Sequence, residues 1–296
     1  MRAGRILAWA LLWLAVLLTV FPFYWMVRTS LTDNDTVYAS NGSLVPPGLT
    51  LSNFARVLGL TDLSSAQAAG GSGAKVNFLV YLRNSVIFTA LIVVGQTLCC
   101  AMAGYALARL RFRGRELVFS VFVGSLMVPP ILTLLPNFTM VKSLGLLNTF
   151  AGLVAPTMLM TPFAVFFLRQ FFLSTPREVE EAARIDGAGT WMVFWRVVLP
   201  MNVGPLLTIG LTTAVWTWKD YLWPLLVGPK DDTRVLTAAL GIFLQQQPTA
   251  HPDWTGLMAA STLTVVPVLI LLLLFGRRLV AALDFTGVTP RKGAST

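Results

Sequence analysis

Six long apolar stretches constrain this chain more than any other feature of its sequence. Each is about long enough for a helix to cross the hydrocarbon layer of a bilayer, which is roughly 30 Å thick and takes about 20 residues. The stretches are Ile6–Val27, Val86–Leu110, Leu117–Leu135, Ala151–Phe172, Gly204–Trp223 and Leu257–Phe275. Charged residues make up 12% of the chain, whereas soluble globular domains carry about 25%. The sequence therefore predicts an all-α polytopic membrane protein with six transmembrane helices, and it excludes a water-soluble enzyme or a disordered chain.

The first apolar stretch resembles a secretory signal peptide in position and hydropathy. However, it ends in the aromatic residues Phe21, Phe23, Tyr24 and Trp25 rather than in the small residues of a cleavage site. We therefore expect it to be retained as a membrane anchor.

The excess of basic residues has two possible meanings. The chain carries 22 basic and 13 acidic residues, a formal net charge of +9, which is compatible with nucleic-acid binding. If the six stretches cross the membrane in turn, 14 of the 22 basic residues share the side of the N-terminus, 7 lie opposite and Lys219 falls within the fifth stretch. This bias follows the positive-inside rule. It predicts that both termini are cytoplasmic, and it accounts for the charge without a nucleic-acid partner.

The expected organisation has four parts. Residues 1–28 form the N-terminal tail and first span, 29–82 an external loop, 83–280 the membrane core with a loop at 174–202, and 281–296 a C-terminal tail. The external loop contains a short amphipathic piece, Leu51–Leu58, and a low-complexity stretch, Thr61–Gly73. The adjacent Cys99 and Cys100 are expected to be packing residues, because neighbours in a helix do not easily bridge and two ligands are too few for a structural metal.

Several apolar stretches contain prolines. They are Pro129, Pro130, Pro156, Pro162 and Pro267. Each removes a backbone donor and kinks or breaks a helix. Taken singly, each fits a bent packing helix, whereas together they favour a bundle around an irregular cavity.

The loop Ser174–Asn202 is the most informative segment. Thr175 is placed as an N-cap, with Pro176 at the first helical position and Glu178 at the third, which is a capping-box arrangement. Gly187 is suited to a left-handed stop. The pattern predicts a short surface helix over Pro176–Asp186.

The two halves of this loop have different faces. Val179, Ala182 and Ala183 form a narrow stripe of mostly small side chains, flanked by charged residues. A second helix is expected to follow and to end at Pro200, with its apolar residues on one side. These apolar residues are Trp191, Phe194, Trp195 and Val198. The residues alone fit either a solvated surface loop or a protruding segment that docks into a partner protein.

A resemblance to a known family bears on this choice. Glu181-Ala182-Ala183, three residues, Gly187, nine residues and then Val197-Val198-Leu199-Pro200 resembles the EAA loop of ABC importer permeases. Val197 replaces the usual Ile. Other segments are similar to sugar permeases of the maltose type, although Lys219 stands where Asn is commoner. These segments are Tyr105–Arg109, Arg111–Gly114, Pro129-Pro130, Leu144–Thr149, Asp186-Gly187-Ala188 and Trp218–Pro224. With six spans and no extra large domain, the chain resembles the smaller membrane subunit of that transporter type.

The resemblance implies a bacterial or archaeal plasma-membrane protein and a set of partners. These would be a second, different permease, a dimer of ABC ATPase subunits, an extracytoplasmic solute-binding protein and a sugar or oligosaccharide substrate. The sequence has no G-x-x-x-x-G-K-[ST] loop, so we expect no cofactor or metal on this non-catalytic chain, with ATP and Mg²⁺ held by the partner ATPase. The residues implied in coupling to the ATPase are Glu181, Ala182, Ala183, Asp186, Gly187, Leu199 and Pro200.

A candidate substrate path follows from polar and aromatic residues within the spans. The candidates are Asn137, Trp216, Trp218, Lys219, Asp220 and Tyr221. Aromatic rings can stack on sugar faces, and an ionisable residue in a span usually faces protein or water. Equally, tryptophan at the end of a span is an ordinary interfacial anchor. We expect His251 to be inert, and the C-terminal tail to be either an ATPase contact or a disordered basic tail.

Two alternatives remain open from the sequence. One is an ABC permease for glycerol phosphate, a polyol or another solute. The other is a six-span secondary transporter or membrane enzyme, which would need an acid–base or metal cluster in the membrane. The spans hold few ionisable residues apart from Lys219 and Asp220, which disfavours the second alternative.

Overall fold

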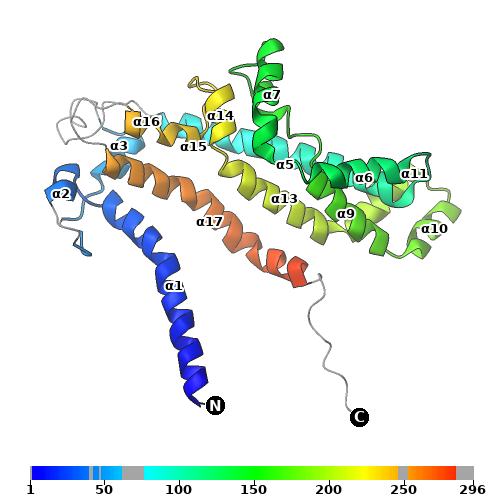
Figure 1. Cartoon of the computed structure of the whole chain (residues 1–296), viewed down its shortest axis with the longest axis horizontal. Helices are drawn as coiled ribbons and strands as arrows, with labels where there is room; N and C mark the ends of the chain where they lie inside the picture. The colour runs from blue at the N-terminus through cyan, green and yellow to red at the C-terminus, as the bar shows by residue number, and fades with distance from the viewer. Residues whose placement is uncertain (1, 40–42, 47, 62–76, 246–252, 285–296) are drawn as a thin grey trace. The chain divides into compact units, whose positions relative to one another are not determined.

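The described part of the chain is helical. The computed structural model describes residues 2–39, 43–46, 48–61, 77–245 and 253–284. All regular elements within these ranges are helices (Figure 1), so the predicted all-α class is confirmed. The chain divides into two compact units, the first comprising 1–83 and 234–267 and the second 84–233 and 268–296.

Three helices have the length and composition of membrane spans. They are α1 (Arg2–Ser30), α5 (Phe78–Arg109) and α17 (Trp254–Asp284). Their spanning portions cover Gly4–Ser30, Phe78–Arg109 and Trp254–Gly276, which correspond to the first, second and sixth predicted stretches. Pro267 lies inside α17 without interrupting it, in contrast to Pro130 and Pro162, each of which starts a new helix.

The third and fifth stretches belong to bent helix pairs. α6 (Arg115–Ser125) and α7 (Pro130–Ser143) meet at 102°, because Pro129 is extended and Pro130 starts a new helix. The second pair joins Thr190–Met201 to α13 (Val203–Trp218) at 79°. If each pair counts as one broken span, the described residues contain up to five candidate spans.

The fourth stretch is not one continuous helix. It is divided into α8 (Phe150–Val154) and α9 (Pro162–Ser174). Pro162 begins α9 after an extended Thr161. With 13 residues, α9 is about 20 Å long and falls short of the hydrocarbon thickness. Six spans therefore remain a prediction, as does the four-part organisation.

A polar cluster holds the first unit together. Besides α1, this unit contains α2 (Asn34–Ala39), α3 (Ser52–Val57), α15 (Leu236–Leu240) and α16 (Ile242–Gln245). Arg56 forms an ion pair of 2.8 Å with the buried Asp253, whose carboxylate also accepts from the backbone N–H of Gly256 in the first turn of α17. The Asn53 amide donates to the carbonyls of Ser30 and Thr32. These bonds join the end of α1 and the start of α17 to the predicted amphipathic piece at 51–58, which is helical as α3.

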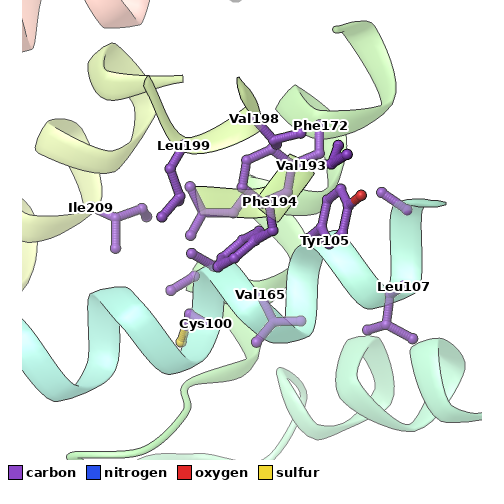
Figure 2. Close-up of a cluster of buried hydrophobic side chains, with 14 residues drawn as sticks. Cys100, Tyr105, Leu107, Val165, Phe172, Val193, Phe194, Val198, Leu199 and Ile209 are labelled. Carbon is purple, nitrogen blue, oxygen red and sulfur yellow. The ribbon is translucent and has the colours of Figure 1, made fainter. Parts of the chain in front are cut away.

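The second unit has an apolar core built from α5, α9, α13 and the segment between α9 and α13 (Figure 2). Gly104 lets α5 and α9 approach closely, since a Cβ there would lie 3.1 Å from the Arg169 nitrogen. Cys100 is buried in this core and Cys99 is half-buried, both as free thiols, as expected for packing residues. α14 (Leu222–Val227) follows α13, and its Trp223 indole donates to the Leu153 carbonyl.

Some expectations concern parts of the chain outside the described residues. α17 continues to Asp284, but the remainder of the C-terminal tail lies beyond it. His251 and most of the low-complexity stretch at 61–73 also lie outside the described ranges.

Candidate functional site

The short helix expected after α9 is present as α10 (Arg177–Ile185). Its predicted cap is wrong, because the N-cap position is Pro176 and no side chain caps the helix. Instead, the buried Thr175 hydroxyl donates to the Phe171 carbonyl and accepts from the Asn202 amide at 3.1 Å. This hydrogen bond pairs two polar side chains that are both buried away from water. The Thr175 side chain therefore points into the interior rather than toward the first turn of α10.

The predicted end of α10 is confirmed. Gly187 has a φ of +87°, which disfavours residues with a side chain. Its N–H donates to the Arg184 carbonyl at 3.0 Å, and the N–H of Ala188 donates to the Ala183 carbonyl at 2.9 Å. These two bonds form a Schellman motif, which satisfies carbonyls that the helix end leaves free.

A buried ion pair attaches α10 to α5. Glu180 and Arg109 lie 2.8 Å apart, with side chains that are only 6% and 5% exposed. The Tyr105 hydroxyl donates to the other oxygen of Glu180 at 3.3 Å, and Arg109 also donates to the Thr175 carbonyl. This network therefore links the loop to the end of α5, and removing one member would leave a buried charge without its partner.

No role for Glu180 or Arg109 was evident from the sequence. One signal was available, since Tyr105 and Arg109 are four residues apart and thus share a face of α5. Their shared partner Glu180, 71 residues after Arg109, is set by the packing of α10 and was not evident from any spacing.

The residues expected to contact the ATPase fall into two groups. Glu181, Ala182, Asp186, Gly187 and Pro200 are exposed, whereas Leu199 is buried and Ala183 packs against the apolar core. The predicted small-residue stripe is thus divided between surface and interior.

The second helix of the loop contains a turn of π-helix. It consists of α11 (Thr190–Val193), η1 (Phe194–Val198) and α12 (Leu199–Met201). Phe194 and Val198 are buried in the core, with the Phe194 ring 5.2 Å from that of Tyr105 (Figure 2). Trp191 and Trp195 are exposed. The predicted apolar side is nevertheless continuous, because the Trp191 ring lies 6.0 Å from that of Phe194 and 5.6 Å from that of Trp195, although of its four residues only Phe194 and Val198 are buried.

The helix also passes through Pro200 instead of ending there. Pro200 occupies the first turn of α12, and the helix ends at Met201 before the bend at Asn202. Pro200 lacks the N–H that would bond to the preceding turn, and it lies one residue before the end of the continuous helix Thr190–Met201.

The candidate substrate-path residues lie on two segments. Trp216 and Trp218 end α13, with Lys219 as its C-cap. Lys219 and Trp216 are brought together, with the Lys219 ammonium 3.6 Å from the centre of an exposed Trp216 ring. Trp218 is buried and Tyr221 is exposed. Asp220 is half-buried, as is Asn137 in the middle of α7.

No metal-binding group emerges from this geometry. Among the residues that the structure describes, no set of three or more His, Cys, Asp or Glu side chains is arranged to hold a metal ion. The expectation that the chain binds no cofactor stays a prediction.

Comparison with known proteins identifies the class. Residues 101–285 match the model of the binding-protein-dependent transport system inner membrane components, and the chain belongs to this family. It is similar to the probable ABC transporter permease protein YurM of Bacillus subtilis (strain 168), with 33% identity over 92% of this chain and 84% of that protein. It is also similar to the diacetylchitobiose uptake system permease protein NgcG of Streptomyces coelicolor, with 33% identity over 93% and 86% of the two chains.

Other similarities agree with this class. The sn-glycerol-3-phosphate transport system permease protein UgpE of Yersinia pestis is 32% identical over 91% of this chain and 92% of that protein. A chain from the crystal structure of a bacterial ABC transporter involved in the import of the acidic polysaccharide alginate has the same fold, with a TM-score of 0.79, 22% identity and coverage of 93% and 96%. The resemblance drawn from the EAA loop is therefore confirmed at the level of the family, whose members are membrane transport components rather than enzymes.

Proposed function

We propose that this chain forms half of the translocation pathway of an ATP-driven importer for a sugar or oligosaccharide. The observation that carries the proposal is similarity along almost the whole chain to permeases named for such solutes. Besides NgcG, the arabinooligosaccharides transport system permease protein AraQ of Halalkalibacterium halodurans is 31% identical over 92% of this chain. Glycerol phosphate is the second candidate, because UgpE is similar to the same extent.

The proposed assembly contains this chain, a second permease, two ATPase subunits and an extracytoplasmic solute-binding protein. In it the chain crosses the plasma membrane six times with both termini cytoplasmic. The bias of basic residues supports this orientation. The candidate spans and bent pairs support a multi-pass arrangement, and ATP and Mg²⁺ are bound by the ATPase partner.

The proposed coupling element is α10. Glu181, Ala182, Asp186 and Gly187 offer an exposed surface to a cleft of the ATPase. When the ATPase subunits close, α10 moves with them. The Glu180–Arg109 pair passes this movement to α5, and the buried Phe194 and Leu199 pass it to the core shared with α9 and α13.

The proposal is tested by purifying the tagged chain gently from its host and counting the proteins that accompany it. We expect one copy of this chain and of a second permease, with two copies of an ATPase. Recovery of the chain alone, or as a homo-oligomer without an ATPase, would contradict the proposal.

The solute is tested with the binding protein captured in the same experiment. Calorimetric titration with oligosaccharides, monosaccharides and glycerol 3-phosphate separates the two candidates. Binding of a sugar supports the first candidate, whereas binding of glycerol 3-phosphate alone supports the second.

A further inference from the structure

A basic pocket lies beside α10 in the second unit. It has a volume of about 890 Å³ and lies between the end of α5, the start of α6 and one side of α10. Arg177, Glu180, Glu181 and Arg184 of α10 line it. Because these residues recur at i, i+3, i+4 and i+7, they share one helix face. Of the proposed docking surface, Glu181 lies on this face, whereas Ala182, Asp186 and Gly187 do not line the pocket.

The charges in this pocket do not balance. Five arginines and three glutamates line it, namely Arg109, Arg111, Arg115, Arg177, Arg184, Glu116, Glu180 and Glu181. Glu180 is paired with Arg109, and Glu116 with Arg115 at 2.7 Å. The remaining lining charges are those of Arg111, Arg177 and Arg184 against Glu181 alone. The pocket therefore carries an excess of two positive charges and suits an anion.

The surroundings of the pocket are apolar and exposed. Its wall includes Leu117 in the first turn of α6, which is 71% exposed, and Val121 one turn further along is 64% exposed. None of the residues of α6 is buried. Phe112 in the wall and Trp191, next to the lining residue Thr190, are also exposed. Aromatic side chains beside arginines, at the point where an apolar helix begins, are typical of the headgroup layer of a membrane.

We propose that this pocket binds the headgroup of an anionic phospholipid of the cytoplasmic leaflet. Guanidinium groups bind phosphate oxygens through paired hydrogen bonds, and basic pockets between membrane helices on the cytoplasmic side are suited to such headgroups. The acyl chains lie along the exposed side of Leu117 and Val121. The inference rests on the cytoplasmic orientation proposed above, and it places a lipid beside α10, with Glu181 shared between the pocket and the surface offered to the ATPase.

The test uses the complete complex purified from membranes. The variant Arg111→Gln/Arg177→Gln removes two pocket charges. The control Arg113→Gln/Arg196→Gln removes two exposed charges of the same unit that do not line the pocket. Each complex is transferred to nanodiscs of phosphatidylcholine, or of equal parts phosphatidylcholine and phosphatidylglycerol. Bound lipid is then counted by native mass spectrometry, and the retained ATPase is measured in parallel.

The wild type and the control are expected to retain phosphatidylglycerol selectively, and the pocket variant to lose this retention. Since each arginine near an anionic membrane contributes to binding, two losses should weaken retention roughly thirtyfold. Equal retention in all three complexes would overturn the proposal, as would equal loss in the control and the pocket variant. Unchanged lipid with loss of the ATPase from the pocket variant would show a protein docking surface instead. If no ATPase accompanies even the wild type, the proposed function fails independently of the lipid count.

Discussion

At the scale of single residues, the ion pair of Arg109 and Glu180 is the main contact that fixes the position of the loop. Both side chains are buried, and each makes one further hydrogen bond, Glu180 to the Tyr105 hydroxyl and Arg109 to the Thr175 carbonyl. A buried ion pair contributes little net stability, but loss of one partner costs about 3–5 kcal/mol. The pair therefore acts mainly to set where α10 lies on α5.

A double-mutant cycle tests this pair. We expect Glu180→Gln and Arg109→Gln each to lower the thermal unfolding midpoint of the purified complex strongly, because each leaves a buried charge unpaired. The unfolding midpoint of the double variant should fall by less than the sum of the decreases in the two single variants. Glu178→Gln, at an exposed position of α10, is the control and should unfold like the wild type. Strict additivity would contradict a direct pairing.

The backbone of Gly187 is a second residue-scale determinant. Gly187→Val places a β-branched residue at positive φ, which costs about 1–2 kcal/mol and disrupts the Schellman motif. We expect reduced co-purification of the ATPase with normal membrane insertion. Gly189→Val is the matched control, because Gly189 has a φ of −67° and open space around its Cβ position. Equal ATPase recovery from both variants would argue against α10 as the docking element.

At the scale of elements, the π turn joins the loop to the core. Phe194 is the first residue of η1 and is 2% exposed, whereas its neighbour Trp195 is exposed. The Phe194 ring packs against Tyr105, while the Trp195 ring, 5.4 Å from that of Phe194, lies at the surface. Because the Phe194 ring belongs to the core that α5 and α9 share, we expect the loop to move with these helices.

Truncation of the two aromatic residues should have different effects. Phe194→Ala removes a buried ring and is expected to cost about 3–5 kcal/mol, seen as a lower unfolding midpoint and reduced transport. Trp195→Ala removes a ring of similar size at an exposed position and should leave the midpoint close to that of the wild type. Similar midpoints for the two variants would contradict the burial of Phe194.

The end of α13 offers a test of the substrate path. Trp216 presents an exposed ring in contact with Lys219. If sugars stack on this ring, Trp216→Ala should raise the half-saturating sugar concentration for transport about two- to tenfold with unchanged assembly. Trp191→Ala, which removes an exposed ring from the loop, is the control. An unchanged half-saturating concentration would show that the transported sugar does not stack on Trp216.

At the scale of the whole molecule, the prediction to test is orientation. The bias of basic residues places the loop at 174–202 inside and the segment at 29–82 outside. In a background with Cys99 and Cys100 replaced by alanine, Ser43→Cys should react with a membrane-impermeant maleimide in intact cells. Ala188→Cys should react only after the cells are opened. The reverse pattern would overturn the orientation and, with it, the cytoplasmic position of α10.

The sequence by itself determined the helical membrane class, the family and the end of α10. These depend on local properties, namely the length of apolar runs, the spacing within the EAA loop and the backbone freedom of Gly187. Such properties depend on residues that are close in sequence, so they can be predicted without knowing how the helices pack.

Which side chains of the loop are buried, and which partners they bind, was decided only by the tertiary structure. Thr175 bonds to Asn202 rather than capping α10, Glu180 pairs with Arg109, and Phe194 is buried while the neighbouring Trp195 is exposed. The division of the fourth apolar stretch was likewise not evident from its hydropathy. The physical reason is that a buried polar group takes whichever partner the packing brings near, and here the partners are 27 and 71 residues apart.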